Sequence, residues 1–182
     1  MKCCKIHNKT REYSDTEKIL ICWVFSHVSF HQALGIPCFL GGMARGLLGR
    51  NNKIHIRQRR RDALAEADVV ILIGTVCDFR LSYGRVLNRK SKVITVNRNR
   101  EQLLKNSDVF WKPTLAVQAD PATFIVQLKA SLPQQPNIDE WVELLKEREI
   151  EKEKTNKLKA EATPEKYFYF LFHNKTLLML AT

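Results

Sequence analysis

The sequence predicts an α/β protein with a Rossmann-like parallel sheet, flanked by helices and followed by a C-terminal helix. Short β-branched runs alternate with helical patterns over residues 37–132, which is typical of βαβ units. Val69–Ile73 (VVILI) is a continuous apolar run, as in strands buried on both faces. A chain of 182 residues supports one domain with extensions, but not two full cores. We therefore expect a domain over residues 34–132, an N-terminal extension over 1–33, and a linker, charged helix and aromatic tail over 133–182.

The first element has two readings. Ser14, Asp15, Thr16 and Glu17 resemble a capping box, which favours a helix over residues 19–34. Alternatively, the apolar start of that segment, residues 19–25, forms a strand, although too few residues then remain for a full crossover helix.

The later elements follow in order. Ahead of Val69–Ile73 we expect a short strand and a helix, at residues 38–40 and 60–67. After it we expect a strand, a short helix and two weaker strands, at residues 92–96, 101–106, 109–111 and 115–118. Asp120 and Pro121 open a helix that runs to Leu132, because Asp is a favoured N-cap and Pro suits the first helical position. A sparse apolar stripe over residues 138–161 predicts a helix that leans on a neighbour, which this chain need not contain.

The charge is unevenly distributed. The formal net charge is +11, and residues 1–138 carry 22 Lys and Arg against 10 Asp and Glu, while residues 139–182 carry 8 against 9. Such a basic body suits an anionic partner such as a nucleotide, a nucleic acid or an anionic lipid. A merely soluble basic surface is the alternative.

The five cysteines are odd in number and have no CxxC spacing, which favours reduced thiols and an intracellular, cytoplasmic location. The apolar run over residues 19–30 begins late for a signal peptide and is too short to span a bilayer. We therefore expect no membrane span.

A glycine-rich segment follows the first predicted strand of the domain. Gly41, Gly42 and Gly46 surround Arg45. Backbone N–H groups exposed by glycines, with a cation beside them, suit a pyrophosphate. A tight turn that needs positive φ angles is the alternative.

Polar residues also follow the buried strand Val69–Ile73. Gly74 and Thr75 come directly after it, and Asp78 and Arg80 lie in the next loop. Open parallel sheets bind their ligands at this edge, so Arg80 is a candidate phosphate ligand. A surface pair between Arg80 and Asp78 is the alternative.

Asn97 ends the next strand, where nucleotide-binding sheets often carry a carboxylate for the ribose hydroxyls. With Arg98 and Arg100 beside it, Asn97 faces less repulsion from an extra phosphate, which favours the ribose phosphate of CoA over FAD or NAD. A solvated strand-to-helix turn explains the same residues equally well.

Three runs, IPCFLGGMARGLLGR (36–50), ADVVILIGTVCDFRLSYG (67–84) and VITVNRNREQLLK (93–105), resemble in order the central domain of acetolactate-synthase-like thiamine-diphosphate enzymes, which include CoA-dependent lyases. The resemblance implies an adenine nucleotide in this domain, FAD in acetolactate synthases and the ADP moiety of CoA in the CoA-dependent members. Gly74, Asp78 and Arg80 match the family stretch Gly-x-x-x-Asp-x-Arg, and Asp120 matches the acidic position near the adenine, although N-capping also explains Asp120. Val76 replaces a second arginine that acetolactate synthases tend to place on the flavin nucleotide, which favours CoA or ADP over FAD.

The resemblance also implies lyase or carboligase activity with thiamine diphosphate and Mg²⁺ in the parent enzymes. Their catalysis needs a glutamate in a pyrimidine-binding domain and a Gly-Asp-Gly motif, but this sequence has no Gly-Asp dipeptide. Neither Glu12 nor Glu17 lies in a domain that could position it. We expect a partial family member, inactive alone, that retains adenine-nucleotide binding. For full-length relatives the resemblance implies an endoplasmic-reticulum membrane anchor or a mitochondrial location.

Two other classes of function remain open. Arg57, Arg59, Arg60 and Arg61, with the arginines near residue 100, suit a nucleic acid weakly, because no recognised fold signature accompanies them. A non-enzymatic interaction fragment is the other class, in which the helix from Ile138 and the aromatic tail dock on full-length family subunits.

Overall fold

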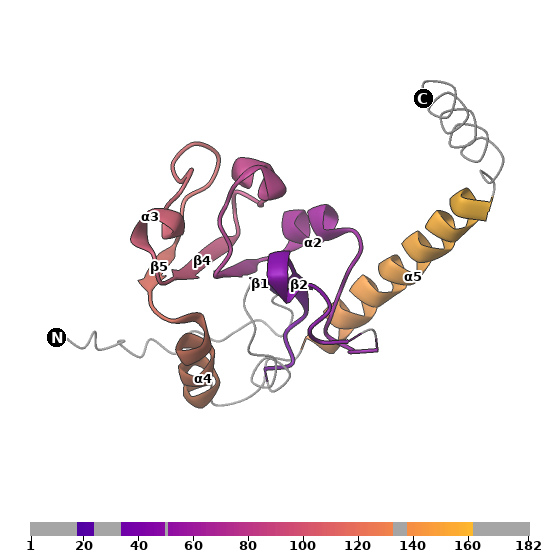
Figure 1. Cartoon of the computed structure of the whole chain (residues 1–182), viewed down its shortest axis with the longest axis horizontal. Helices are drawn as coiled ribbons and strands as arrows, with labels where there is room; N and C mark the ends of the chain where they lie inside the picture. Colours follow the sequence, from indigo (N-terminus) through magenta and orange to yellow (C-terminus); the bar gives the residue numbers. More distant parts are fainter. Residues whose placement is uncertain (1–17, 24–33, 50, 133–137, 162–182) are drawn as a thin grey trace, which may run out of the picture.

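The computed structural model describes residues 18–23, 34–49, 51–132 and 138–161 (Figure 1). Within these residues five parallel strands form one sheet in the order β2-β1-β3-β4-β5. The strands are β1 (Ile19–Trp23), β2 (Cys38–Leu40), β3 (Val69–Ile73), β4 (Lys92–Asn97) and β5 (Leu115–Gln118). The predicted α/β class with a parallel sheet is confirmed.

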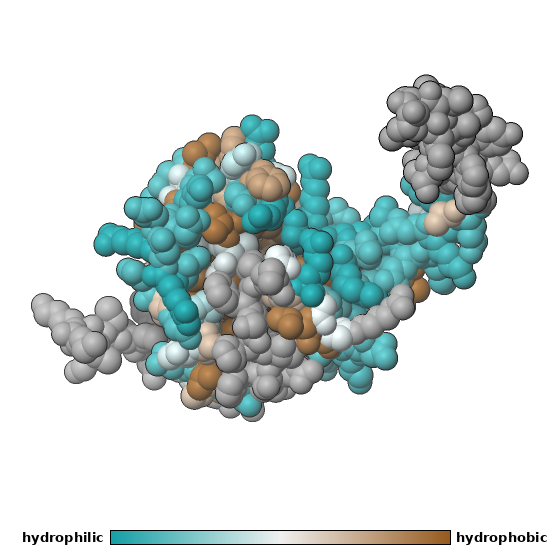
Figure 2. Space-filling view, viewed as in Figure 1, coloured by the Kyte–Doolittle hydropathy of each residue, from teal (hydrophilic) through white to brown (hydrophobic). Residues whose placement is uncertain are grey.

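Four α-helices accompany the sheet in the described residues: α2 (Arg60–Glu66), α3 (Arg100–Leu103), α4 (Pro121–Ser131) and α5 (Asp139–Glu161). Two 3-10 segments, η1 (Gly42–Ala44) and η2 (Phe79–Gly84), follow β2 and β3. Figure 1 shows the second half of α5 projecting away from the sheet, and Figure 2 shows that this part is largely hydrophilic. None of the described helices combines the length and the apolar character that crossing a membrane requires.

The strand reading of the first element is confirmed, and the helix reading is wrong for residues 19–23. β1 lies between β2 and β3, with Ile19 opposite Val69 in the register. Leu20 and Ile21 are fully buried. The run is apolar at successive positions, so a strand covered on both faces buries more of it than a one-sided helix would. The rest of the expected helix, residues 24–33, lies outside the described residues.

The strand expected at residues 109–111 is also wrong. This segment is a turn in which the amide of Asp108 donates a hydrogen bond to the carbonyl of Trp111 over 2.8 Å. Val109 is exposed while the Trp111 ring packs into the core. Trp111 thus anchors a turn in the core, and the segment is not part of the five-stranded sheet.

The helix over residues 138–161 has its neighbour within this chain. Ile138, Trp141 and Leu145 are buried and belong to the main hydrophobic core. The apolar stripe of α5 is therefore covered by the body of the same chain. Beyond this stripe, Ile150 and Leu158 are exposed singly on a polar helix.

The strand order creates a switch point at the sheet's carboxyl edge. From β1 the chain goes to β2 on one side, and β3 pairs with β1 on the other side. In the 2-1-3-4-5 order of doubly wound sheets, the crevice beyond the carboxyl ends of the first and third strands is where ligands bind. The loops after β2, β3 and β4 all open at this edge.

Candidate functional site

Hydrogen bonds join the end of β3 to the ends of its two neighbouring strands at the carboxyl edge. The hydroxyl of Thr75 donates to the carbonyl of Cys22 over 3.2 Å, and the amide of Gly74 donates to the carbonyl of Val96 over 2.8 Å. Gly74 has a φ of +61°, which turns the chain sharply at the end of β3. Both predicted residues therefore lie at the carboxyl edge, where they fix the backbone that a ligand would meet.

The glycine-rich segment after β2 forms the tight turn that was the alternative to a phosphate site. Gly42 and Gly46 have φ angles of +55° and +89°, and the amide of Ala44 donates to the carbonyl of Gly41 over 3.1 Å. A Cβ added at Gly46 would meet no atom within 4 Å. The turn conformation explains these glycines, and it also leaves an open backbone beside Arg45.

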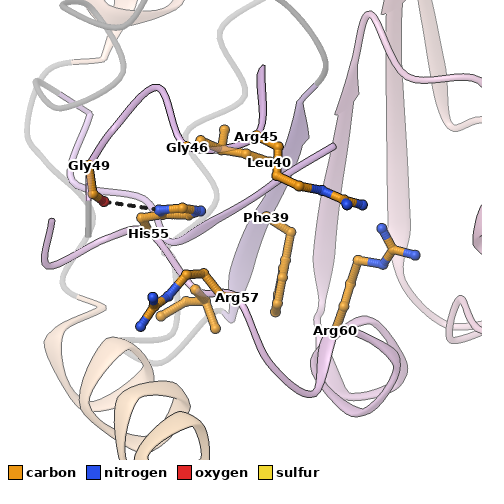
Figure 3. Close-up of a pocket in the computed structure, with 9 residues that line it drawn as sticks. Phe39, Leu40, Arg45, Gly46, Gly49, His55, Arg57 and Arg60 are labelled. Atoms are coloured by element: carbon orange, nitrogen blue, oxygen red, sulfur yellow. Dashed lines mark hydrogen bonds between the residues drawn. The ribbon is translucent and has the colours of Figure 1, made fainter. Parts of the chain in front are cut away.

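A cavity of about 680 Å³ lies against this turn. Its walls come from the end of β2, the glycine-rich turn and the segment that leads into α2; they comprise Phe39, Leu40, Arg45, Gly46, Gly49, His55, Ile56, Arg57 and Arg60. Figure 3 shows the guanidinium groups of Arg45 and Arg60 turned toward one another from opposite sides. The cavity is thus basic and partly apolar.

Arg57 lines the same cavity but is held by α5. Its Nε lies 3.2 Å from Glu149 Oε1, and its Nη2 lies 2.7 Å from Glu153 Oε1. Figure 3 shows its side chain directed toward α5. The positive charge of Arg57 is therefore compensated by the two carboxylates of α5.

Glu149 is the centre of this contact. Its side chain is 4% exposed, and it accepts hydrogen bonds from the Arg57 amide over 2.7 Å and from Lys146 Nζ over 2.9 Å. Burial acts to raise the pKa of Glu149, but the hydrogen bonds and charges of Lys146 and Arg57 lower it below its ordinary value overall. Glu149 is thus a buried carboxylate that stays ionised.

His55 joins the cavity to α5 through its backbone. Lys146 Nζ donates to the carbonyl of His55 over 2.7 Å, while His55 Nδ1 donates to the carbonyl of Gly49 over 3.3 Å. Burial lowers the pKa of His55, opposed in part by that hydrogen bond to Gly49. The ring is therefore neutral near pH 7 and holds the end of the glycine-rich turn.

The loop after β3 pairs Asp78 with Arg80, as the alternative reading of Arg80 expected. Asp78 accepts from the Arg80 amide over 2.9 Å and lies 3.1 Å from Arg80 Nη1. The carbonyl of Arg80 accepts from Arg60 Nη2 over 2.6 Å. Arg60 therefore links the cavity beside β2 to the loop after β3.

The ends of β4 and β5 come together through an ion pair. Arg98 Nε donates to Asp120 Oδ1 over 2.6 Å, and Asp120 caps α4 by accepting from the Thr123 amide over 3.0 Å. These contacts, first the Thr123 amide and then Arg98, hold the pKa of Asp120 below its ordinary value. Asn97 accepts from the Asn99 amide over 3.1 Å, as in a strand-to-helix turn. Its neighbour Arg98 is exposed.

All the sequence-predicted site residues thus lie at one edge of the sheet, in three groups. The first follows β2, the second follows β3 and the third follows β4 and β5; they are Gly41, Gly42, Arg45 and Gly46, then Gly74, Thr75, Asp78 and Arg80, then Asn97, Arg98 and Asp120. Of the first group, Arg45 and Gly46 line the cavity. Sequence reasoning missed Arg60, which it placed in a nucleic-acid-binding run. The order of the elements could have identified it. Arg60 begins the helix that precedes the parallel strand β3, and such a helix begins at the carboxyl edge of the sheet.

The described residues do not form the kind of site that holds a metal ion together with a diphosphate. Within them no group of three or more His, Cys, Asp and Glu side chains is placed to hold a metal ion. The cavity wall holds three arginines among apolar residues and glycines, and it contains no Asp or Glu.

Comparison with known proteins gives a family and several relatives. The family model described as "Thiamine pyrophosphate enzyme, central domain" matches residues 26–128. Two relatives are named 2-hydroxyacyl-CoA lyase 2: the Danio rerio protein is 60% identical over 136 residues, covering 75% of this chain and 22% of the relative, and the Homo sapiens protein is 59% identical over 129 residues, covering 71% and 20%. The acetolactate synthase large subunit of Mycobacterium tuberculosis is 36% identical over 63 residues, covering 35% and 12%. The chain therefore spans about a fifth of the length of the lyases that it matches.

Proposed function

This chain belongs to the thiamine pyrophosphate enzyme family through that central domain, and from this premise we propose that the carboxyl edge of its sheet binds the ADP moiety of a CoA-type nucleotide. The observation that carries the proposal is the basic cavity beside the switch point, where Arg45 and Arg60 converge on an open glycine turn. The Danio rerio and Homo sapiens relatives have "2-hydroxyacyl-CoA" in their name, which agrees with this ligand class.

Two strand-end residues favour CoA or ADP over FAD. Asn97 removes the carboxylate that would repel a phosphate on the ribose, and Arg98 beside it is exposed. Val76 offers no charge at the flavin-linked position of the acetolactate synthases. An extra ribose phosphate would therefore meet no carboxylate at position 97, and beside it the Arg98 side chain that is paired with Asp120.

The proposed role is binding rather than catalysis. Among the described residues no group of three or more His, Cys, Asp and Glu side chains is placed to hold a metal ion, and the sequence has no Gly-Asp dipeptide of the kind with which the family holds magnesium and thiamine diphosphate. The lyase or carboligase reaction of the family, with its thiamine diphosphate and magnesium, would then depend on protein outside the 182 residues, which supply the nucleotide-holding part.

The arginine run supports a small anion better than a nucleic acid. Arg57 is paired with Glu149 and Glu153, and Arg59 Nη2 lies 3.2 Å from Glu151 Oε2. Two of the four arginines are therefore neutralised by α5. A nucleic-acid surface would need them exposed together.

Thermal unfolding with added ligands tests the proposed function. We expect CoA and ADP to raise the melting temperature, because a ligand at 100 times its Kd stabilises the folded state by about 2.7 kcal/mol. Thiamine diphosphate should leave it unchanged when excess Mg²⁺ complexes its diphosphate. Lys112→Gln is a control that removes one charge ahead of β5, at the amino edge of the parallel sheet, and it should keep the full shift. If CoA, ADP and FAD all fail to shift the transition, nucleotide binding by this chain is ruled out.

A further inference from the structure

We infer that Arg60 is a ligand for the diphosphate of the bound nucleotide and that it acts with Arg45 as a two-sided clamp. This inference rests on the proposed function and names the residues that would grip the anion. Arg60 comes from the first turn of α2, whereas Arg45 follows η1 on the far side of the cavity. The two residues are therefore positioned by independent elements.

The facing guanidinium groups form a site of uncompensated charge. Figure 3 shows them directed at one another across the cavity. Among the residues that the structure describes, neither Arg45 nor Arg60 has a carboxylate partner. Two like charges held in this way repel one another, and an anion between them converts the repulsion into two attractions.

Arg57 shows by contrast which cations are available. It lines the same cavity, yet Glu149 and Glu153 neutralise it from α5. Of the three arginines in the cavity wall, the chain thus holds one in ion pairs and leaves two facing the space.

The guanidinium of Arg60 is fixed before any ligand arrives. Its Nη2 donates to the carbonyl of Arg80 over 2.6 Å. The remaining N–H donors lie in the same plane, which suits bidentate contact with phosphate oxygens. Because the side chain is already held in place, less side-chain entropy is lost when a ligand binds.

The charge of Arg60 also acts on a residue of β1. Burial raises the pKa of the Cys22 thiol to about 12, and the charge of Arg60 acts against that rise. Cys22 lies near the carboxyl end of β1. The charge of Arg60 therefore reaches the crevice between β1 and β3.

The surroundings of the clamp suit a diphosphate. Gly46 and Gly49 have φ angles of +89° and +75°, and a Cβ added at either would meet nothing within 4 Å. Backbone can thus approach a ligand closely on the Arg45 side. Phe39 and Ile56 add an apolar wall against which the rest of a nucleotide can pack.

Titration calorimetry on the full chain with ADP, CoA and inorganic pyrophosphate tests this inference. Arg60→Gln should weaken the binding of all three ligands at least about tenfold, because it removes charged hydrogen bonds to the diphosphate. Arg60→Lys keeps the charge but loses the planar fork, so we expect an intermediate loss. Arg61→Gln is the matched control: it removes an equal charge from the adjacent, exposed residue, which does not line the cavity, and should bind as the wild type does.

The outcomes separate the clamp from the proposed function. If ADP binds the wild type and Arg60→Gln binds it as well as Arg61→Gln does, the clamp is wrong and nucleotide binding stands. If pyrophosphate binds through Arg60 but ADP and CoA do not bind, Arg60 holds a free diphosphate only, and both the nucleotide proposal and the clamp on a bound nucleotide are overturned. If no ligand binds the wild type, both are overturned. Should Arg60→Gln fail to fold, Arg45→Gln, at an exposed position, applies the same test to the other half of the clamp.

Discussion

Gly84 is the last residue of η2, and its backbone passes close to the side chain of Trp111. Its φ is +88°, and an added Cβ would lie 2.2 Å from Trp111 Cδ1. We expect Gly84→Ala to lower the free energy of unfolding by about 2–4 kcal/mol, from backbone strain plus overpacking. Urea denaturation measures the loss.

Gly46 provides the control for that substitution. It has the same backbone strain as Gly84 but lacks the contact with a neighbouring side chain. Its φ is +89°, but a Cβ there would meet nothing within 4 Å. Gly46→Ala should therefore cost only the backbone term, about 1–2 kcal/mol. Equal losses for the two alanine variants would show that the Trp111 ring moves aside freely.

Thr95 is a residue whose removal should help the fold. It is buried in β4, and its hydroxyl has no hydrogen-bond partner among the described residues. Thr95→Val keeps the shape and removes an unpaired polar atom, so we expect the free energy of unfolding to rise by about 1 kcal/mol. In Thr75→Val the hydroxyl that is lost donates to Cys22, and stability should fall. A destabilised Thr95→Val would mean that the hydroxyl has a partner.

At the scale of elements, α5 is joined to the sheet domain by Glu149 as much as by its apolar stripe. Glu149→Gln leaves the cations of Arg57 and Lys146 without their shared carboxylate. We expect a loss of about 2–3 kcal/mol, less than for a fully buried pair because Arg57 is partly exposed. Glu143→Gln, at an exposed position on the same helix, is the control and should change little in denaturant unfolding.

The same contact predicts a dependence on pH. The folded pKa of Glu149 lies below its ordinary value of 4.5, so in acid the unfolded chain takes up the proton first. Its stabilising contribution is therefore complete above pH 4.5 and is lost as the pH falls through the folded pKa. The stability gap between wild type and Glu149→Gln should narrow over that range. A gap that stays constant down to pH 3 would contradict the lowered pKa.

The elements that sequence predicted correctly are those with local signals. β3 is a continuous apolar run, and α4 begins at an Asp-Pro pair whose capping needs only neighbouring residues. β1 stayed ambiguous because its state depends on pairing with β3, whose residues lie about 50 positions away. The residues of the candidate site differ in the same way. The Gly41–Gly46 segment can be recognised from neighbouring residues alone, whereas the position of the Arg60 side chain depends on its hydrogen bond to the carbonyl of Arg80, 20 residues away in the sequence.

At the scale of the whole molecule, the net charge of +11 is compensated unevenly. Acidic residues of α5 meet Arg57 and Arg59, and Arg148 of α5 pairs in return with Glu66 of α2. The carboxyl edge beside the cavity keeps Arg45 and Arg60 without carboxylate partners among the described residues. α5 thereby neutralises Arg57 and Arg59 next to the cavity, while Arg45 and Arg60 keep their charge at the edge where an anion is proposed to bind.

The last consequence concerns how much of the chain is needed for folding. Ile138, Trp141 and Leu145 are buried in the same core as the sheet, and burying three such side chains contributes about 5–8 kcal/mol, comparable with the whole stability of a typical domain. A chain ending at Leu132 should therefore lose cooperative thermal unfolding, followed by circular dichroism, whereas a chain ending at Glu161 keeps α5 and should retain it. Both chains lack residues 162–182, so their difference isolates residues 133–161. A shortened chain that melts as cooperatively as the longer one would show that α5 is dispensable for the core.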